Sequence, residues 1–211
     1  MKTAWMGAAM LALMAAGAAD AHEVWVERDG AGPARIYLGE PAEPMPAGGD
    51  PEFANLKTPR IVAPAAAALV RKAGFLEAQL PAGDVHVWDD DVFAPWGDPG
   101  KREGIIYYAR AGRADPRTKL PFEIAPATAN GTRFVLTREG KPVAGAKVTL
   151  ISPTRVSTEL VTDAAGAITP PLVERGRYLL SAAAKDMTEH SLPRGPVTTL
   201  HRITTTSFTL P

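Results

Sequence analysis

Four histidines carry most of the chemistry open to this sequence, because it contains no cysteine. They are His22, His86, His190 and His201. Without thiols, the chain cannot form a disulfide, a thiolate zinc site or a cysteine nucleophile. Any metal site must therefore use imidazoles, carboxylates, carbonyl oxygens or a free chain terminus.

His22 stands where an export signal is expected to end. Lys2 gives the chain a positive start, an apolar stretch follows, and Ala19-Asp20-Ala21 matches the pattern of a signal-peptidase site. The sequence thus predicts a signal peptide over residues 1–21, a periplasmic location and a mature chain that begins at His22. Cleavage removes one charge of each sign and the one long apolar run, so the mature chain stays formally neutral and no membrane span is expected.

A histidine at a chain terminus can chelate a metal ion by itself. An α-amino group and an imidazole both lose protons near neutral pH, and together they close a six-membered ring on one ion through the amine and Nδ1. A second imidazole would complete a T of three nitrogens, the arrangement called a histidine brace. Such a tetragonal nitrogen set suits Cu(II) and, less well, Ni(II). The plainer interpretation is that His22 is a solvated terminus.

The second imidazole is predicted among the remaining histidines. His201 is the first choice, because it opens the last predicted strand, which can lie beside the first strand. His190 lies in a polar segment and is a candidate additional ligand that could fold over the terminus. His86 is expected on an outward, solvated face, beside the acidic run at 89–91, which lacks the pattern of a calcium loop. Glu23, Glu27 and a tyrosine such as Tyr107 or Tyr108 are candidates for an axial or outer position.

The spacing of the 20 prolines and 19 glycines leaves little room for long helices. Short alternating segments between turn residues predict an all-β chain. We expect two tandem β-sandwich units, an N-terminal domain over 22–124 and an immunoglobulin-like or transthyretin-like domain over 125–211. In the second unit, the Tyr178 hydroxyl is expected to bond to nearby backbone. The segment 63–80 is interpreted as strands rather than as a helix because Gly74 interrupts it.

The last predicted strand, 199–210, has apolar residues on both of its faces. Ile203 shares a face with His201, whereas Leu200 and Phe208 share the other. Either a bulge switches the inward face or both faces are covered.

Several segments together resemble one family of exported proteins. They are His22 to Glu27, Leu120 to Pro126, Gly140 to Val148, Thr162 to Gly166 and Gly176 to Tyr178. Over these segments the chain is similar to a periplasmic domain-of-unknown-function family regarded as an accessory component of nickel or cobalt transport, the NikM-like group. The resemblance implies a periplasmic metal-handling protein in which the mature terminal histidine is a ligand. Relatives carry a further His near the position of Ala183 or Ala184, and this chain departs from that pattern.

The leading functional hypothesis is a periplasmic metal-binding protein that holds copper through His22 and acts in metal homeostasis or uptake. The expected partners are the metal ion and a membrane metal transporter or an outer-membrane receptor system; the balanced charge gives no reason to expect nucleic acid. A nickel- or cobalt-uptake accessory is the first alternative. A metal-free β-sandwich binding module is another, with four aromatic anchors: Trp25, Trp88, Phe93 and Trp96. A copper oxidoreductase is less favoured, because no second catalytic constellation is visible.

Overall fold

The computed structural model describes residues 22–211, so the predicted signal peptide and its cleavage lie outside the described residues. The described part of the chain is built from β-strands and one short 3-10 helix, η1 (Pro51–Asn55). The prediction of an all-β chain is therefore confirmed. Within residues 22–211, no helix is long and apolar enough to cross a membrane.

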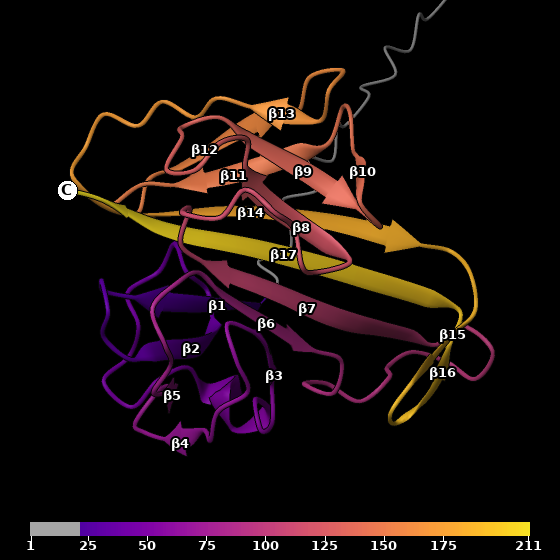
Figure 1. The fold of residues 1–211 in the computed structure, drawn as a ribbon. Helices are drawn as coiled ribbons and strands as arrows, with labels where there is room; N and C mark the ends of the chain where they lie inside the picture. Colours follow the sequence, from indigo (N-terminus) through magenta and orange to yellow (C-terminus); the bar gives the residue numbers. More distant parts are fainter. Residues whose placement is uncertain (1–21) are drawn as a thin grey trace, which may run out of the picture.

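A seven-stranded sheet forms the centre of the protein (Figure 1). Its order across the sheet is β12 (Ser157–Val161), β11 (Lys147–Ile151), β14 (Gly176–Asp186), β17 (Thr199–Leu210), β7 (Glu103–Ala111), β6 (Val85–Asp89) and β3 (Arg60–Ala63). The pairs are antiparallel except β17 with β7, which run parallel. A parallel pair needs a crossover connection, and here the crossover contains most of the second half of the chain.

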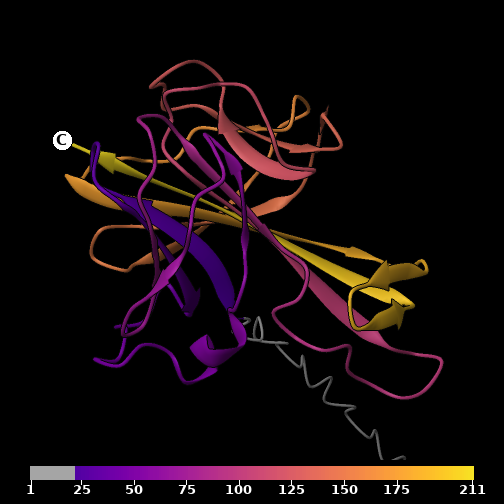
Figure 2. The same cartoon turned by 60° about the horizontal axis from the view of Figure 1, so that its bottom comes forward.

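Two smaller sheets cover opposite faces of the central sheet. One has the order β1 (Glu23–Arg28), β2 (Ala34–Gly39), β5 (Leu76–Ala78) and β4 (Val70–Arg71). The other contains β10 (Lys141–Pro142), β9 (Phe134–Arg138), β13 (Ala167–Ile168) and β8 (Phe122–Pro126), which pairs with β9. In Figure 1 the indigo and purple strands of the first lie below the diagonal pair β7 and β17, and β8 and β9 lie above it. A hairpin of β15 (His190–Leu192) and β16 (Gly195–Val197) lies at one end of that pair, as the turned view of Figure 2 also shows.

The alternation of β7 shows that the central sheet is covered on both faces. Ile105 and Tyr107 belong to the apolar core shared with the β1 sheet, whereas Ile106 and Tyr108 belong to the core shared with β8 and β9. Successive side chains of a strand point to opposite faces, so a strand buried on both sides reads as a continuous apolar run. This accounts for the unbroken β-forming sequence of β7.

The occurrence of apolar residues on both faces of β17 has the same explanation. Thr205 donates from Oγ1 to the Val24 carbonyl oxygen of β1 at 2.8 Å, and Thr206 donates from Oγ1 to the Ile124 carbonyl oxygen of β8 at 2.6 Å. The pairing with β14 continues without interruption from Gly176 to Asp186. Both faces of β17 are therefore covered, and the bulge considered from the sequence is not needed.

The prediction of two tandem sandwich units is not confirmed. The central sheet contains strands from both predicted halves, joined where β17 pairs with β7 over nine residue pairs. The predicted boundary between residues 124 and 125 also falls inside β8. The sequence could not reveal this pairing, because it joins strands about a hundred residues apart.

Two local predictions are confirmed. The segment 63–80 contains the short strands β4 and β5 and no helix. The Tyr178 hydroxyl donates to the Glu174 carbonyl oxygen at 3.0 Å and accepts the Glu174 N–H at 2.8 Å. The hydroxyl thereby closes the loop that enters β14.

Candidate metal site at His22 and His201

His22 and His201 line the same cavity, although 179 positions separate them in the sequence. The cavity has a volume of about 400 Å³. Its wall consists of His22, Phe93, Trp96, Ile105, Tyr107, Ala183, His201 and Ile203. We call it the His22–His201 cavity. It is positioned by β1, which packs across β7 and β17 and brings the residue before it to their side.

His22 is held through one ring nitrogen. Its Nε2 donates to Asp50 Oδ1 at 3.1 Å, and the His22 side chain retains 29 % of its exposure. Asp50 is also the cap of η1, where its Oδ1 accepts the Glu52 N–H at 2.7 Å. With Nε2 engaged, Nδ1 is the nitrogen that remains for another partner.

His201 is held in the same way. Its Nε2 donates to Glu103 Oε2 at 2.5 Å, and the ring stacks on Trp96 with centroids 5.8 Å apart and planes 24° from parallel. Backbone bonds in both directions, of 3.0 and 2.9 Å, pair Trp96 with Glu103. The hydrogen bond from His201 holds the pKa of Glu103 below its usual range, and Lys185 Nζ lies 3.6 Å from the same oxygen.

Two ionisable groups lie beside this cavity. Burial raises the pKa of Glu23 to about 7, against the opposing effect of a 2.6 Å bond from Ser181 Oγ. Burial also raises the pKa of Tyr107, and the nearby charges of Glu23 and Asp89 act in the same direction. The Tyr107 phenol is therefore neutral at physiological pH. Of the four candidate outer residues, Tyr107 lies on the cavity wall, and Glu23, Glu27 and Tyr108 do not.

His190 lies in a different environment. It begins β15, its Nε2 contacts Thr188 Oγ1 at 3.0 Å, and the same nitrogen lies 3.8 Å from Asp186 Oδ2. Asp186 also accepts a bond from Arg202, which projects from β17 on the face opposite His201. His22 and His201 therefore line one cavity, and His190 is not among its lining residues.

A metal site made of side chains alone is not found in the described part of the chain. Among residues 22–211, no group of three or more His, Asp or Glu side chains is placed to hold a metal ion. A brace needs only two imidazoles, because its third nitrogen is the chain terminus. Metal-bound histidines commonly donate their other ring N–H to a carboxylate, which fixes the tautomer and the ring orientation. Asp50 and Glu103 occupy that position for His22 and His201.

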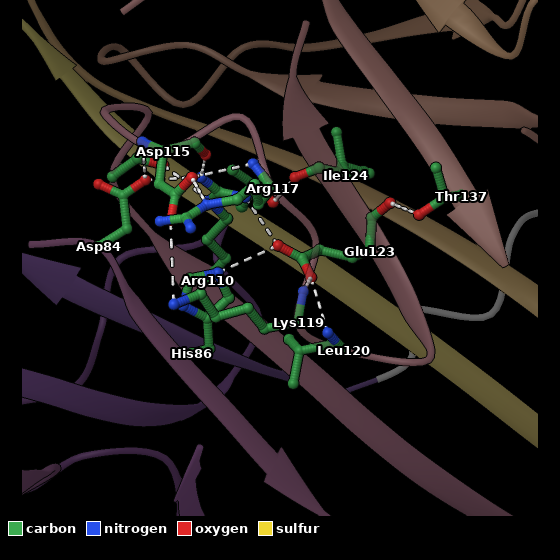
Figure 3. Close-up of polar contacts among 12 residues, drawn as sticks. Asp84, His86, Arg110, Asp115, Arg117, Lys119, Leu120, Glu123, Ile124 and Thr137 are labelled. Atoms are coloured by element: carbon green, nitrogen blue, oxygen red, sulfur yellow. Dashed lines mark hydrogen bonds and ion pairs between the residues drawn. The ribbon is translucent and has the colours of Figure 1, made fainter. Parts of the chain in front are cut away.

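The prediction that His86 faces solvent is wrong. His86 is fully buried, and its Nε2 lies 3.2 Å from Glu123 Oε1. The face of β6 that was interpreted as outward is covered by β8 and by the segment before it. Figure 3 shows the buried polar cluster that results, with Arg110 between Asp84 and Glu123. Arg110 is paired with both Asp84 and Glu123, whereas the buried Nδ1 of His86 has no hydrogen-bond partner among the described residues.

The four predicted aromatic anchors differ in exposure. Trp25 is 6 % exposed and belongs to a small core with Ile151 and Leu179. Trp88 is half-buried under the Arg60 guanidinium, 4.3 Å from its ring centroid. Trp96 is 42 % exposed, and it is also the residue that stacks on His201. The exposed aromatic surface at this end of the protein thus belongs to the candidate metal site.

The sequence analysis missed Asp50, Glu103 and the Trp96 stack. One signal for two of them was present: Trp96 and Glu103 flank the turn at Gly97–Gly100 at positions that pair across it. Their pairing with each other could be inferred from that spacing. Their position beside His201 depends on the pairing of β7 with β17, for which the sequence carries no local signal.

The comparisons with known proteins add little to this description. No protein-family model matches the chain, and no curated protein matches it. A solved structure of SGBP-B from the Bacteroides ovatus mixed-linkage glucan utilization locus, in complex with a mixed-linkage heptasaccharide, aligns at 12 % identity and a TM-score of 0.19. The alignment covers 89 % of this chain, which spans about half (46 %) of the length of that one. At that TM-score the likeness supports no conclusion about fold or ligand.

Proposed function

We propose that this protein is a periplasmic copper-binding protein whose site is formed by His22 and His201. The observation that carries the proposal is that both imidazoles lie on the wall of one cavity, each with its Nε2 bound to a carboxylate. Within residues 22–211, the hydrogen bonds found for the two rings are made by Nε2 and not by Nδ1. In His22, Nδ1 is also the atom that closes a six-membered chelate with the α-amino nitrogen of the same residue.

Three nitrogens of this kind favour copper. Affinity for nitrogen sites among divalent first-row ions peaks at Cu(II), and imidazole is a good ligand for copper, nickel and zinc. The two carboxylates behind the rings fix the orientation of the imidazoles, which is a usual role of such partners in metal sites. Binding requires the amine and both imidazoles to be deprotonated, so copper affinity should fall as the pH is lowered.

The proposed role is to store, buffer or deliver the ion outside the cytoplasm. Export would create the chelating terminus, because the amine of His22 becomes available only when residues 1–21 are removed. The precursor would then lack the site, and copper would be bound only after translocation. A membrane metal transporter or an outer-membrane receptor system is the proposed recipient or source of the ion.

The test begins with the protein recovered from the periplasm after export, with its N-terminus determined by mass spectrometry. Cu(II) affinity and the EPR spectrum are then measured for this protein, for a form with one residue added before His22, and for His201→Ala. We expect the added residue and His201→Ala each to weaken binding at least about tenfold and to change the spectrum. The matched control is His190→Ala, which should bind as the parent does.

Four outcomes would overturn the proposal. One is a mature chain that begins at another residue. Another is equal affinity and an identical spectrum with and without the added residue. The third is Ni(II) or Co(II) displacing copper at equal concentration, which would favour the alternative of a nickel- or cobalt-uptake accessory. Protein that is free of metal by elemental analysis and binds none in titration would instead indicate a metal-free binding module.

A further inference from the structure

We propose that the His22–His201 cavity also binds a small quaternary ammonium ion, of the trimethylammonium class to which choline belongs. Such a ligand needs neither a metal ion nor a free chain terminus, so this binding site goes beyond the proposed function. Three features of the cavity favour it: the aromatic rings on the wall, the apolar side chains beside them, and the sign of the charges behind the two imidazoles.

Aromatic rings form a large part of the cavity wall. Phe93 packs on Tyr107 with ring centroids 6.4 Å apart and planes tilted by 59°, so the two rings form a corner. Trp96 lies on the wall as well, where it stacks on His201 and remains 42 % exposed. The faces of aromatic rings are electronegative, and several rings around one cavity are an established way to hold a quaternary ammonium ion.

The rest of the wall suits the methyl groups of such an ion. Ile105 and Ile203 are buried and form the base of the cavity, whereas Ala183 and Trp96 are exposed and leave it open to solvent. A quaternary ammonium ion has no N–H to donate, so it needs no hydrogen-bond acceptor on the wall. A cavity of about 400 Å³ lies in the range of small-molecule sites, and its open side allows the polar end of the ligand to stay in water.

The charges around the cavity favour a cation. None of the described residues on the wall is Lys or Arg, and each of the two imidazoles is bonded to a carboxylate, Asp50 or Glu103. Lys185 lies 3.6 Å from Glu103 and compensates part of its charge, whereas the ion pair found for Asp50 within residues 22–211 is with His22 itself. Two anions opposed by one lysine leave a negative potential at the wall, which attracts a cation from solution.

The experiment uses the processed protein freed of metal and kept with a metal chelator. Isothermal titration measures the binding of choline and of its neutral isostere, an alcohol in which a tert-butyl group replaces the trimethylammonium group. We expect choline to bind at least about tenfold more tightly than the isostere. Equal affinities would show that the wall recognises apolar shape alone and would overturn the inference, as would failure to bind choline. Either result leaves the copper proposal standing, because copper binding is measured without choline.

Two variants test the contribution of the rings. Trp96→Leu and Phe93→Leu each keep an apolar side chain on the wall and remove its aromatic face. Each should weaken choline binding about tenfold and change binding of the neutral isostere by less than about threefold. Trp88→Leu is the matched control, because Trp88 packs against the core on the opposite face of the central sheet, and it should leave both affinities unchanged. Thermal unfolding confirms that each variant folds, and Trp96 is at an exposed position where a leucine is tolerated. An undiminished preference for choline in Trp96→Leu would overturn the account.

Discussion

Arg110 on β7 donates from Nη1 to Glu123 Oε1 on β8 at 2.7 Å, and both side chains are fully buried. The same guanidinium donates from Nη2 to Asp84 Oδ2 at 2.6 Å. The other oxygen of Glu123 accepts the backbone N–H groups of Lys119 and Leu120 at 2.7 and 2.8 Å. This buried cluster connects the central sheet to the β8 strand that covers it, across the position where the sequence predicted a domain boundary.

We expect Glu123→Ala to destabilise the protein strongly. The substitution leaves Arg110 buried with one carboxylate fewer and leaves two backbone N–H groups without their acceptor. Breaking a buried ion pair by removing one partner typically costs about 3–5 kcal/mol of unfolding free energy. Urea unfolding followed by tryptophan fluorescence measures this. Glu159→Ala, which removes the partner of Lys147 from an exposed pair, is the matched control and should change stability by less than about 0.5 kcal/mol.

A second prediction concerns Asp89, which is 5 % exposed at the end of β6. Burial raises the pKa of Asp89 from 3.8 to about 6, with smaller contributions from Asp90 and Asp91. Between these two values the folded protein binds more protons at this site than the unfolded chain. The contribution of Asp89 to stability therefore falls as the pH rises through this window and then stays constant.

Asp89→Asn removes that penalty and should stabilise the protein at neutral pH. The amide oxygen of Asn can still accept the Asp91 N–H, which Asp89 Oδ1 now accepts at 2.8 Å. The expected gain is about 1–2 kcal/mol near pH 7.5 and close to zero near pH 4, where Asp89 is protonated in the folded state. Urea unfolding at the two pH values measures the difference. A gain of the same size at both would contradict the assignment, and Asp98→Asn on an exposed loop controls for the loss of surface charge.

The Tyr178 hydroxyl supports a third prediction. In Tyr178→Phe, the Glu174 N–H and carbonyl oxygen lose the hydroxyl as partner, while the ring keeps its stacking on Phe208. We expect a loss of about 1–2 kcal/mol in unfolding free energy. Hydrogen exchange should show faster opening of the loop before β14, with the core strands less affected. Unchanged stability and exchange would show that the bonds to Glu174 contribute nothing net.

The contrast between Tyr178 and His86 shows how far the sequence alone could be used. The Tyr178 bonds are local, because they join residues four positions apart, and the turn residues before the strand predicted them. The burial of His86 depended on whether the face of β6 on which it lies was covered. The cover is β8, which follows about forty residues later. The alternation of side chains along β6 assigned each residue to the correct face of the strand. It could not show that both faces were buried. The same limit applies to β17. Its apolar residues on both faces were, like the unbroken apolar run of β7, a sign of a sheet covered on two sides.

The candidate metal site was predicted in part for a related reason. His22 was identified by its place in the sequence. His201 was chosen because its strand was expected beside the first strand; the two strands pack against each other but belong to different sheets. Asp50 and Glu103 hold the two rings only because η1 and β7 lie beside them. Residues that orient a site from separate elements carry no pattern that spacing can reveal, so they become visible only with the fold.

A final prediction uses two neighbouring alanines of β14. Ala183 lies on the wall of the His22–His201 cavity and pairs with Ile203, whereas Ala184 points to the other face and packs against the core shared with β8 and β9. Ala183→His would therefore add a third imidazole to the cavity, and Ala184→His would add one on the wrong side of the sheet. Because Ni(II) prefers more nitrogen donors than a brace supplies, we expect Ala183→His to raise Ni(II) affinity by about tenfold, and Ala184→His to leave it unchanged. Isothermal titration of the processed protein measures both, and thermal unfolding confirms that each variant folds. Equal Ni(II) affinity in the two variants would mean that the cavity does not gather imidazoles around an ion.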